Sequence, residues 1–298
     1  MTGEAAAVAF GPQTLNILGD RLFDEGDVEG AIREYRRGLQ LDPGHVNLLN
    51  SLGVCYGRLG DQRAAEAAFD DVLRLVPDDL MATFNKGLSL LLSGRPEEAE
   101  RWLERSAALD PGNHEALYQL GKTALELGHA EKALTALEAT SALKGKRAGL
   151  HCLLGRARAL AGDAAGARAA YKQAVKANPD DAESLSALGE LYRGEGRDVA
   201  FALSLMRRSV ELDPSNSLFR RRLGKLLYDM GRFKDAERHL KSALEFSGRA
   251  AGAPEGGGLE VLAAELERCR LASPEEEVPA EEAEEGAGEG AMGGERLA

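Results

Sequence analysis

The chain of 298 residues has few aromatic residues, few cysteines and no long apolar run. Aromatic residues make up only 5% of it, a composition typical of helices packed through alanine and leucine. Its three cysteines, Cys55, Cys152 and Cys269, are odd in number and far apart, which argues against a disulfide framework and against a paired zinc motif. We therefore expect a protein of a reducing compartment, the cytoplasm.

Signals for membrane insertion and for catalysis are also scarce. The most apolar run, residues 88–92, is too short to span a bilayer, and the first ten residues lack a basic segment and a long apolar core. The five histidines are scattered without an HExxH motif, and no glycine-rich phosphate loop follows a strand pattern. We expect no membrane insertion, no catalytic residue, no cofactor, no metal and no enzymatic activity.

Basic residues are fewer than acidic ones, and the resulting negative charge is unevenly distributed along the chain. Of the net charge of -12, residues 251–298 contribute 13 acidic and 3 basic side chains, whereas residues 1–250 carry 36 acidic and 34 basic ones. The absence of a basic arm argues against nucleic acid as a partner. The acidic segment 272–298 is predicted to be disordered.

Glycine, by contrast, is abundant, and fourteen of the 35 glycines fall into two columns with a step of 34 residues, once 35. The first column is Gly19, Gly53, Gly87, Gly121, Gly155, Gly189 and Gly224. The second lies seven residues later, at Gly26, Gly60, Gly94, Gly128, Gly162, Gly196 and Gly231. A fixed period of this size indicates a solenoid, in which each repeat buries its apolar face against its neighbours.

Each repeat has the pattern of two helices. Apolar residues at helical spacing precede and follow the first glycine, which predicts a helix A. Because glycine is unfavourable inside a helix, we expect this glycine to allow the close approach of a neighbouring helix. The second glycine predicts the turn that ends helix A. A helix B follows, with a column of alanines from Ala31 to Ala236, and proline closes five of the repeats.

This pattern resembles the tetratricopeptide repeat (TPR) family, most fully in LLNSLGVCYGRLGDQRAAEAAFDDVLRLVP at residues 48–77. The resemblance covers residues 12–250 and implies an all-α, right-handed superhelical solenoid, whose A helices line a concave face that commonly holds a peptide or a partner's helix. The chain departs from the pattern where Gly145 and Gly248 replace the closing proline, where one residue is inserted between Gly196 and Ala202, and at Lys86.

The resulting domain prediction has four parts. Residues 1–11 form an N-terminal extension, and seven repeats follow at 12–45, 46–79, 80–113, 114–147, 148–181, 182–216 and 217–250. Residues 251–271 are a linker with a short helix, and 272–298 are the acidic tail. The short helix is interpreted either as a cap on the open edge of the seventh repeat or as a mobile helix that binds a partner.

Two binding patterns known in the family are missing here. No three successive repeats supply the Lys, Asn and Arg side chains of a carboxylate clamp, and the groove positions do not form an asparagine ladder. The third and fourth repeats offer instead an apolar stripe with polar neighbours, which we predict to bind a partner: Met81, Phe84, Asn85, Leu88, Leu91, Tyr118, Gln119 and Lys122. The alternative is that Phe84 and Leu88 pack between repeats.

A second candidate is the basic run in the seventh repeat, at Arg221, Arg222 and Lys225. It is suited to an acidic partner or to the acidic tail of the same chain, docked intramolecularly, with an affinity that falls as salt rises. A solvated basic face is the alternative.

The sequence thus predicts a non-catalytic adaptor or scaffold for a protein or peptide partner. The alternative is an accessory module of a multi-protein assembly, secretion or modification machine that recruits substrate to an enzyme. Nothing in the sequence fixes a homo-oligomeric state.

Overall fold

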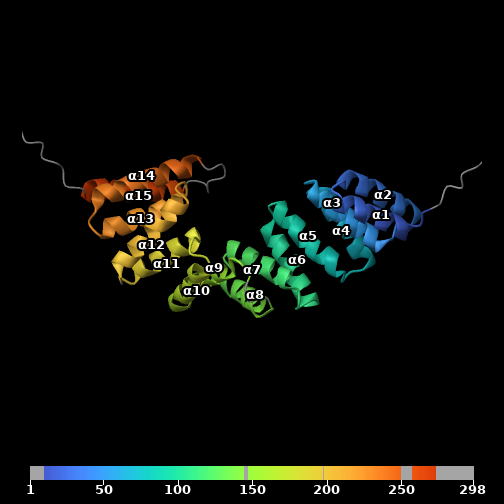
Figure 1. Ribbon diagram of the computed structural model, residues 1–298, viewed down its shortest axis with the longest axis horizontal. Coiled ribbons are helices and arrows are strands. Elements are labelled where there is room, and N and C mark those ends of the chain that lie inside the picture. The colour runs from blue at the N-terminus through green and yellow to red at the C-terminus, as the bar shows by residue number, and fades with distance from the viewer. Residues whose placement is uncertain (1–9, 144–146, 197, 250–256, 273–298) are drawn as a thin grey trace, which may run out of the picture. The chain divides into compact units, whose positions relative to one another are not determined.

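A computed structural model of the chain describes residues 10–143, 147–196, 198–249 and 257–272, and all their regular elements are helices (Figure 1). The predicted all-α solenoid of helix pairs is confirmed. The helices are α1 (Pro12–Asp24), α2 (Val28–Leu41), α3 (Val46–Arg58), α4 (Gln62–Leu75), α5 (Leu80–Leu92), α6 (Pro96–Leu109), α7 (His114–Glu126), α8 (Ala130–Leu143), α9 (Leu150–Leu160), α10 (Ala164–Ala177), α11 (Ala182–Gly194), α12 (Val199–Leu212), α13 (Ser217–Asp229), α14 (Phe233–Arg249) and α15 (Gly257–Ala272).

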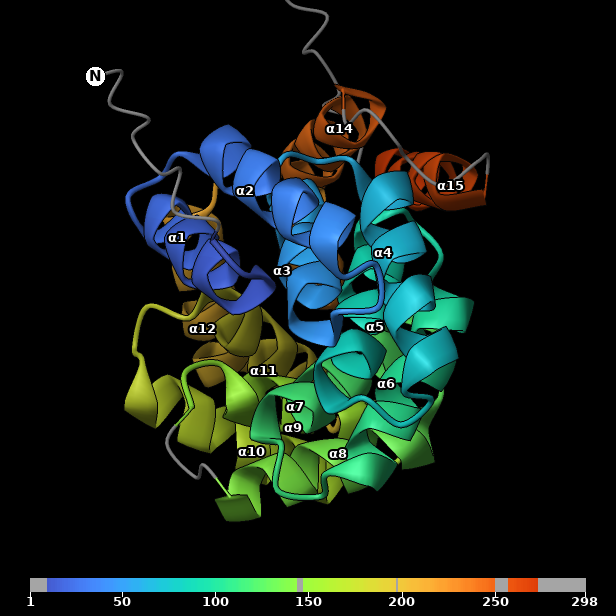
Figure 2. The ribbon, with the colours of Figure 1, turned by 90° about the vertical axis from the view of Figure 1, so that its right-hand side faces the viewer.

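The chain divides into two compact units, residues 1–195 and residues 196–298. In unit 1, which holds α1 to α11, each helix packs against the next, as Figure 2 shows for α1 and α2. The odd-numbered helices also touch one another, α1 with α3, α3 with α5, α7 with α9, and α9 with α11. These neighbouring odd-numbered helices therefore lie side by side, and the even-numbered helices pack against them.

The two glycine columns have the structural roles that the sequence predicts. A Cβ atom on Gly53 would lie 2.5 Å from the Phe69 ring, and one on Gly87 would lie 2.9 Å from Leu103, so the first glycine lets helix B approach. The seven glycines of the second column all have positive φ angles, from 63° to 90°. This is the left-handed conformation that ends a helix with glycine.

Most helices begin at a side chain that accepts a hydrogen bond from the first turn, as Asp61 does from the Ala64 amide at 3.1 Å. Helix α9 differs, because the residue before it is Gly149, with a φ of 75° and no side chain to accept such a bond. The chain enters α9 from the end of the fourth repeat, where the closing proline is missing. Gly149 and its neighbour Ala148 line a groove of unit 1.

The division between the units falls inside the predicted sixth repeat, next to the inserted residue. Asp198 is the one non-glycine residue with a positive φ, 45°, in the part of the chain that the structure describes. Its side chain accepts a hydrogen bond from the Phe201 amide at 3.3 Å and so starts α12. Asp tolerates the left-handed region better than most residues, so this position absorbs the extra residue.

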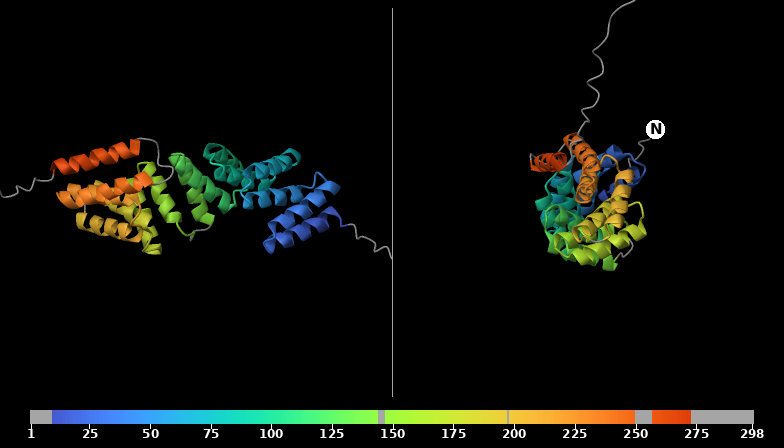
Figure 3. Two further views of the ribbon diagram at one scale, coloured as in Figure 1. Left: turned by 90° about the horizontal axis from the view of Figure 1, so that it is seen from above. Right: turned by 90° about the vertical axis from the view of Figure 1, so that its left-hand side faces the viewer.

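In unit 2, helix α15 lies along α14 (Figure 3). It buries Leu262, Leu266 and Cys269, whose spacing of four and three residues follows one helical face. Ala263, next to Leu262 in the sequence, is exposed, because the buried face runs through Leu266 to Cys269. The thiol of Cys269 donates to the carbonyl oxygen of Phe233 at 3.1 Å and fixes this end of α15 at the start of α14.

Candidate functional site

The apolar stripe predicted in the third repeat lies on α5, but much of it is core. Phe84 and Leu91 are half-buried and pack against the buried residues Leu103, Leu120 and Ala136 of the third and fourth repeats. Leu88 and Asn85 are also half-buried, whereas Met81 is 59% exposed. Packing between repeats therefore accounts for Phe84 and Leu91, and Met81 is the most open member of the stripe.

The predicted residues of the fourth repeat, Tyr118, Gln119 and Lys122, lie on α7 and belong to a polar network. The guanidinium carbon of Arg147 lies 3.5 Å from the centroid of the Tyr118 ring, and the ammonium of Lys122 lies 5.9 Å from it. Arg147 donates two hydrogen bonds to the Glu115 carboxylate, at 2.6 and 3.3 Å. The Gln119 amide donates to the same carboxylate at 2.9 Å.

This network fixes both the charge state and the position of its members. The hydrogen bonds from Arg147 hold the pKa of the Glu115 carboxyl below its usual range. Stacking on Tyr118 and pairing with Glu115 restrain the long side chain of Arg147, so it is presented in one orientation. The fourth repeat thus offers a fixed cation beside an aromatic ring.

Arg147 and Tyr118 lie at one side of a groove of about 750 Å³ in unit 1. The N-terminal part of α9, the C-terminal end of α10 and the start of α11 supply the rest of it. Its lining residues are Tyr118, Arg147, Ala148, Gly149, His151, Cys152, Leu153, Ala174, Ala177, Asn178, Asp181 and Glu183.

Several of these residues are small, so the wall leaves room for the main chain of a bound segment. The lining also includes polar groups: Arg147 and His151 come from the start of α9 and the residues before it, and Asn178, Asp181 and Glu183 come from the end of α10 and the start of α11. Sequence reasoning identified Tyr118 but missed the others. The sequence signal for this junction is the replacement of the closing proline of the fourth repeat by Gly145.

The cysteine that lines the groove is not activated as a nucleophile. Burial raises the pKa of the Cys152 thiol to about 12, so this cysteine stays protonated near neutral pH and is a poor nucleophile. Among the described residues, no group of three or more His, Cys, Asp or Glu side chains is placed to hold a metal ion.

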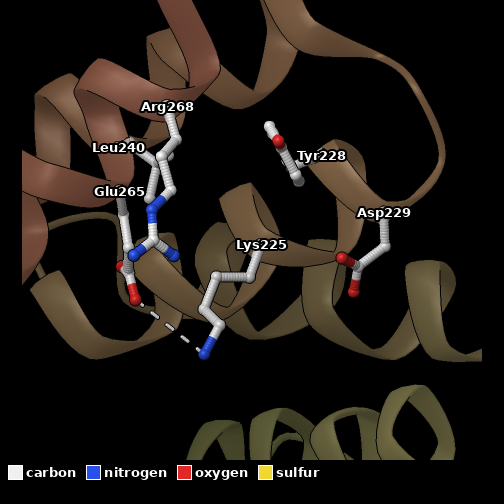
Figure 4. A pocket seen from close by; sticks show the side chains of 6 residues that line it. All are labelled: Lys225, Tyr228, Asp229, Leu240, Glu265 and Arg268. Carbon is white, nitrogen blue, oxygen red and sulfur yellow. Dashed lines mark ion pairs between the residues drawn. The ribbon is translucent and has the colours of Figure 1, made fainter. Parts of the chain in front are cut away.

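The basic residues predicted in the seventh repeat lie on α13, in unit 2, and all three are half-buried. Arg221 donates two hydrogen bonds, at 2.8 and 2.7 Å, to the carboxylate of Glu265 on α15. The ammonium of Lys225 lies 3.9 Å from the same carboxylate (Figure 4). The acidic group that meets this surface comes from α15; residues 273–298, the rest of the predicted tail, lie outside the described part of the chain.

No helix within residues 10–143, 147–196, 198–249 and 257–272 is long and apolar enough to cross a membrane.

Four family models of the tetratricopeptide repeat match the chain in succession. They cover residues 19–60, residues 56–114 together with 152–217, residues 90–156, and residues 220–255. The matches extend over the helix pairs of both units.

Among curated proteins, the protein CTR9 homolog of Arabidopsis thaliana is 26% identical over 274 residues, covering 76% of this chain and 25% of that protein. The FK506-binding protein-like protein of Homo sapiens is 33% identical over 116 residues, covering 36% of this chain and 33% of that protein. The chain therefore spans about a quarter to a third of the length of these relatives.

Among solved structures, a tetratricopeptide repeat protein from Parabacteroides merdae has a TM-score of 0.58 at 17% identity, covering 87% of this chain and 98% of that one. A likeness at this identity supports the fold alone. Together with the glycine period and the helix pairs, the four successive matches show that the chain belongs to the tetratricopeptide repeat family.

Proposed function

We propose that the chain is a protein-interaction scaffold that holds an extended segment of a partner protein in the groove of unit 1. The observation that carries the proposal is the groove itself, about 750 Å³ in volume and bounded by α7, α9, α10 and α11. Its size and its mixture of small and polar side chains suit a peptide better than a flat protein surface.

The lining residues give the bound segment two kinds of contact. At Ala148, Gly149 and Ala177 the short side chains allow a peptide main chain to lie close to the wall. Arg147 and His151 can donate hydrogen bonds to its carbonyl oxygens or carboxylates, and Asn178 can both donate and accept. Since Arg147 is already held by Glu115 and Tyr118, little side-chain entropy is lost when it binds.

Filling the groove is expected to weaken binding without unfolding the repeats. Peptides selected from a random phage-displayed library on the intact chain supply the ligands. Ala177→Trp, at the exposed end of α10 within the groove, should weaken their binding by at least about tenfold, a loss of ~1.4 kcal/mol. Binding is measured by isothermal titration calorimetry.

The matched control is Ala169→Trp, which changes another exposed alanine of the same helix, outside the groove, and should bind as the unmodified chain does. Circular dichroism must show both variants folded. If no peptide is selected, or if both variants bind equally well, the groove is not the binding site and the proposal fails.

A further inference from the structure

The guanidinium of Arg147 is held on one planar face and along one edge. Its central carbon lies 3.5 Å from the centroid of the Tyr118 ring. At this distance the guanidinium lies flat on the ring, because an edge-on approach would drive its N–H groups into the ring. Both terminal nitrogens donate to the Glu115 carboxylate, at 2.6 and 3.3 Å. The chain itself therefore occupies one face and the terminal edge of this group.

The positive charge of Arg147 is balanced inside the chain. The hydrogen bonds from Arg147 hold the pKa of the Glu115 carboxyl below its usual range, so this carboxylate is ionised near neutral pH and pairs with the guanidinium. The groove lining also holds the carboxylates of Asp181 and Glu183. An acidic group on a ligand would therefore gain little electrostatic energy here. Charge is not the property by which Arg147 distinguishes one ligand from another.

The planar face of Arg147 opposite Tyr118 is left for a ligand. The side chain is 27% exposed and lines the groove, and within the described part of the chain Tyr118 is the one ring stacked on it. An arginine plane stacks well on aromatic rings because its charge is delocalised and it is more weakly hydrated than an ammonium group. The second face is therefore suited to a second aromatic ring.

The groove has room for such a ring beside Arg147. Ala148 and Gly149 follow Arg147 directly, and both are exposed and line the groove. A Cβ atom on Gly149 would meet no atom within 4 Å, so the space over this residue is open. Tyr118 is the one aromatic side chain among the lining residues, so no second ring of the lining fills this space.

We propose that the groove of unit 1 selects partner segments that carry an aromatic side chain, whose ring stacks on the free face of Arg147 and encloses the guanidinium between itself and Tyr118. This inference rests on the proposed scaffold function and adds the class of segment that the groove accepts. Because Tyr118 and Glu115 already fix the guanidinium plane, the geometry for stacking is formed before the ligand binds.

The first test uses three blocked amino acids as probes: the N-acetyl amides of tryptophan, leucine and aspartate. Each is titrated into the isotope-labelled full chain, and NMR follows the Nε–Hε signal of Arg147, which is identified by its absence in Arg147→Lys. The tryptophan probe should move this signal upfield and saturably, because a ring shields a proton that lies over its face. The leucine probe should bind about fivefold more weakly or less, since it lacks the cation–π contact.

Three results of this titration would overturn the stacking proposal. The first is no upfield shift with the tryptophan probe, and the second is a leucine probe that binds as tightly. The third is an aspartate probe that binds more tightly than the tryptophan probe, which would mean that Arg147 recognises its ligand through charge.

A matched pair of arginine variants assigns the effect to the guanidinium plane. Arg147→Lys keeps the positive charge but removes the plane, so it should bind the tryptophan probe about fivefold more weakly, measured on the Gly149 amide signal. The control, Arg158→Lys, changes an arginine of α9 outside the groove lining and should bind the probe as the unmodified chain does. Circular dichroism must show both variants folded. Equal binding by all three chains would overturn the proposal.

The peptides selected on the chain separate this inference from the scaffold function. If their affinity falls on Ala177→Trp but is unchanged when each aromatic residue of the peptide is replaced by leucine, the scaffold function stands and the aromatic preference is wrong. If one such replacement also weakens binding by about fivefold, and Arg147→Lys removes that difference, both proposals are supported.

Discussion

Replacing Gly53 with valine is expected to lower the free energy of unfolding by about 3 kcal/mol. A Cβ at this position would lie 2.5 Å from the Phe69 ring, and Phe69 is only 2% exposed, so the ring cannot swing out into solvent. It is enclosed by the buried residues Leu49, Val72 and Ala82. Valine also gains little helix propensity over glycine, since its χ1 is restricted in a helix. Urea denaturation followed by circular dichroism measures the loss.

The same helix supplies a control. A Cβ on Gly57 meets no atom within 4 Å, so Gly57→Val should change stability by less than about 0.5 kcal/mol. Adding Phe69→Leu to Gly53→Val should recover part of the loss, because the third and fourth repeats place Leu103 and Leu137 at the equivalent contact. An equal loss for Gly53→Val and Gly57→Val would disprove the close-approach role of the first glycine column.

The period of the glycines made the fold predictable from one sequence. Each glycine column meets one local structural need: a positive φ, as at Gly60, or close approach of a helix, as at Gly53. These needs recur in every helix pair, so the glycines recur with the same period. Periodicity does not predict a structural change that occurs at only one position of the chain. The division of the chain lies beside Asp198, close to a single inserted residue, and the effect of such an insertion depends on how the backbone accommodates it.

The candidate site was harder to predict for the same reason. Phe84 and Leu91 follow the spacing of a groove face, but that spacing also serves contacts with the next repeat, and the structure places both against Leu103 and Leu120. Arg147 and His151 belong to a junction that departs from the repeat pattern. The periodicity of the sequence therefore gives no indication of their role. The groove forms where one repeat junction differs from the others, so the residues that the repeats have in common do not predict it.

Charge pairs between repeats are likewise set by tertiary contacts, and one with a buried carboxylate joins α6 to the start of α8. Glu100 is 5% exposed and lies 2.8 Å from Nδ1 of His129 and 3.2 Å from the ammonium of Lys132. Burial alone raises the pKa of the Glu100 carboxyl, but the hydrogen bonds from His129 and Lys132 outweigh burial and hold that pKa below its ordinary value. The ionised form of Glu100 is therefore favoured only while His129 and Lys132 are present.

Removing both partners with His129→Ala/Lys132→Ala is expected to lower the free energy of unfolding at pH 7 by about 3–5 kcal/mol, because Glu100 is left as a buried charge without compensation. Glu100→Gln should lose only about 1 kcal/mol, since His129 and Lys132 are exposed enough to be hydrated once the carboxylate is gone. Urea denaturation of the three chains gives both differences. A greater loss for Glu100→Gln than for the double variant would contradict this assignment.

The pH dependence separates this ion triad from a loss of packing. In the unmodified chain the folded pKa of Glu100 is lowered, so its stabilising contribution is complete above the ordinary carboxyl pKa of 4.5 and is lost as the pH falls through the folded value. In the double variant burial acts alone and raises the pKa of Glu100, so protonation relieves the buried charge as the pH falls. The stability difference between the two chains should therefore shrink from pH 7 towards pH 4. A difference that stays constant over this range would mean that the two side chains stabilise the fold through packing rather than through the charge of Glu100.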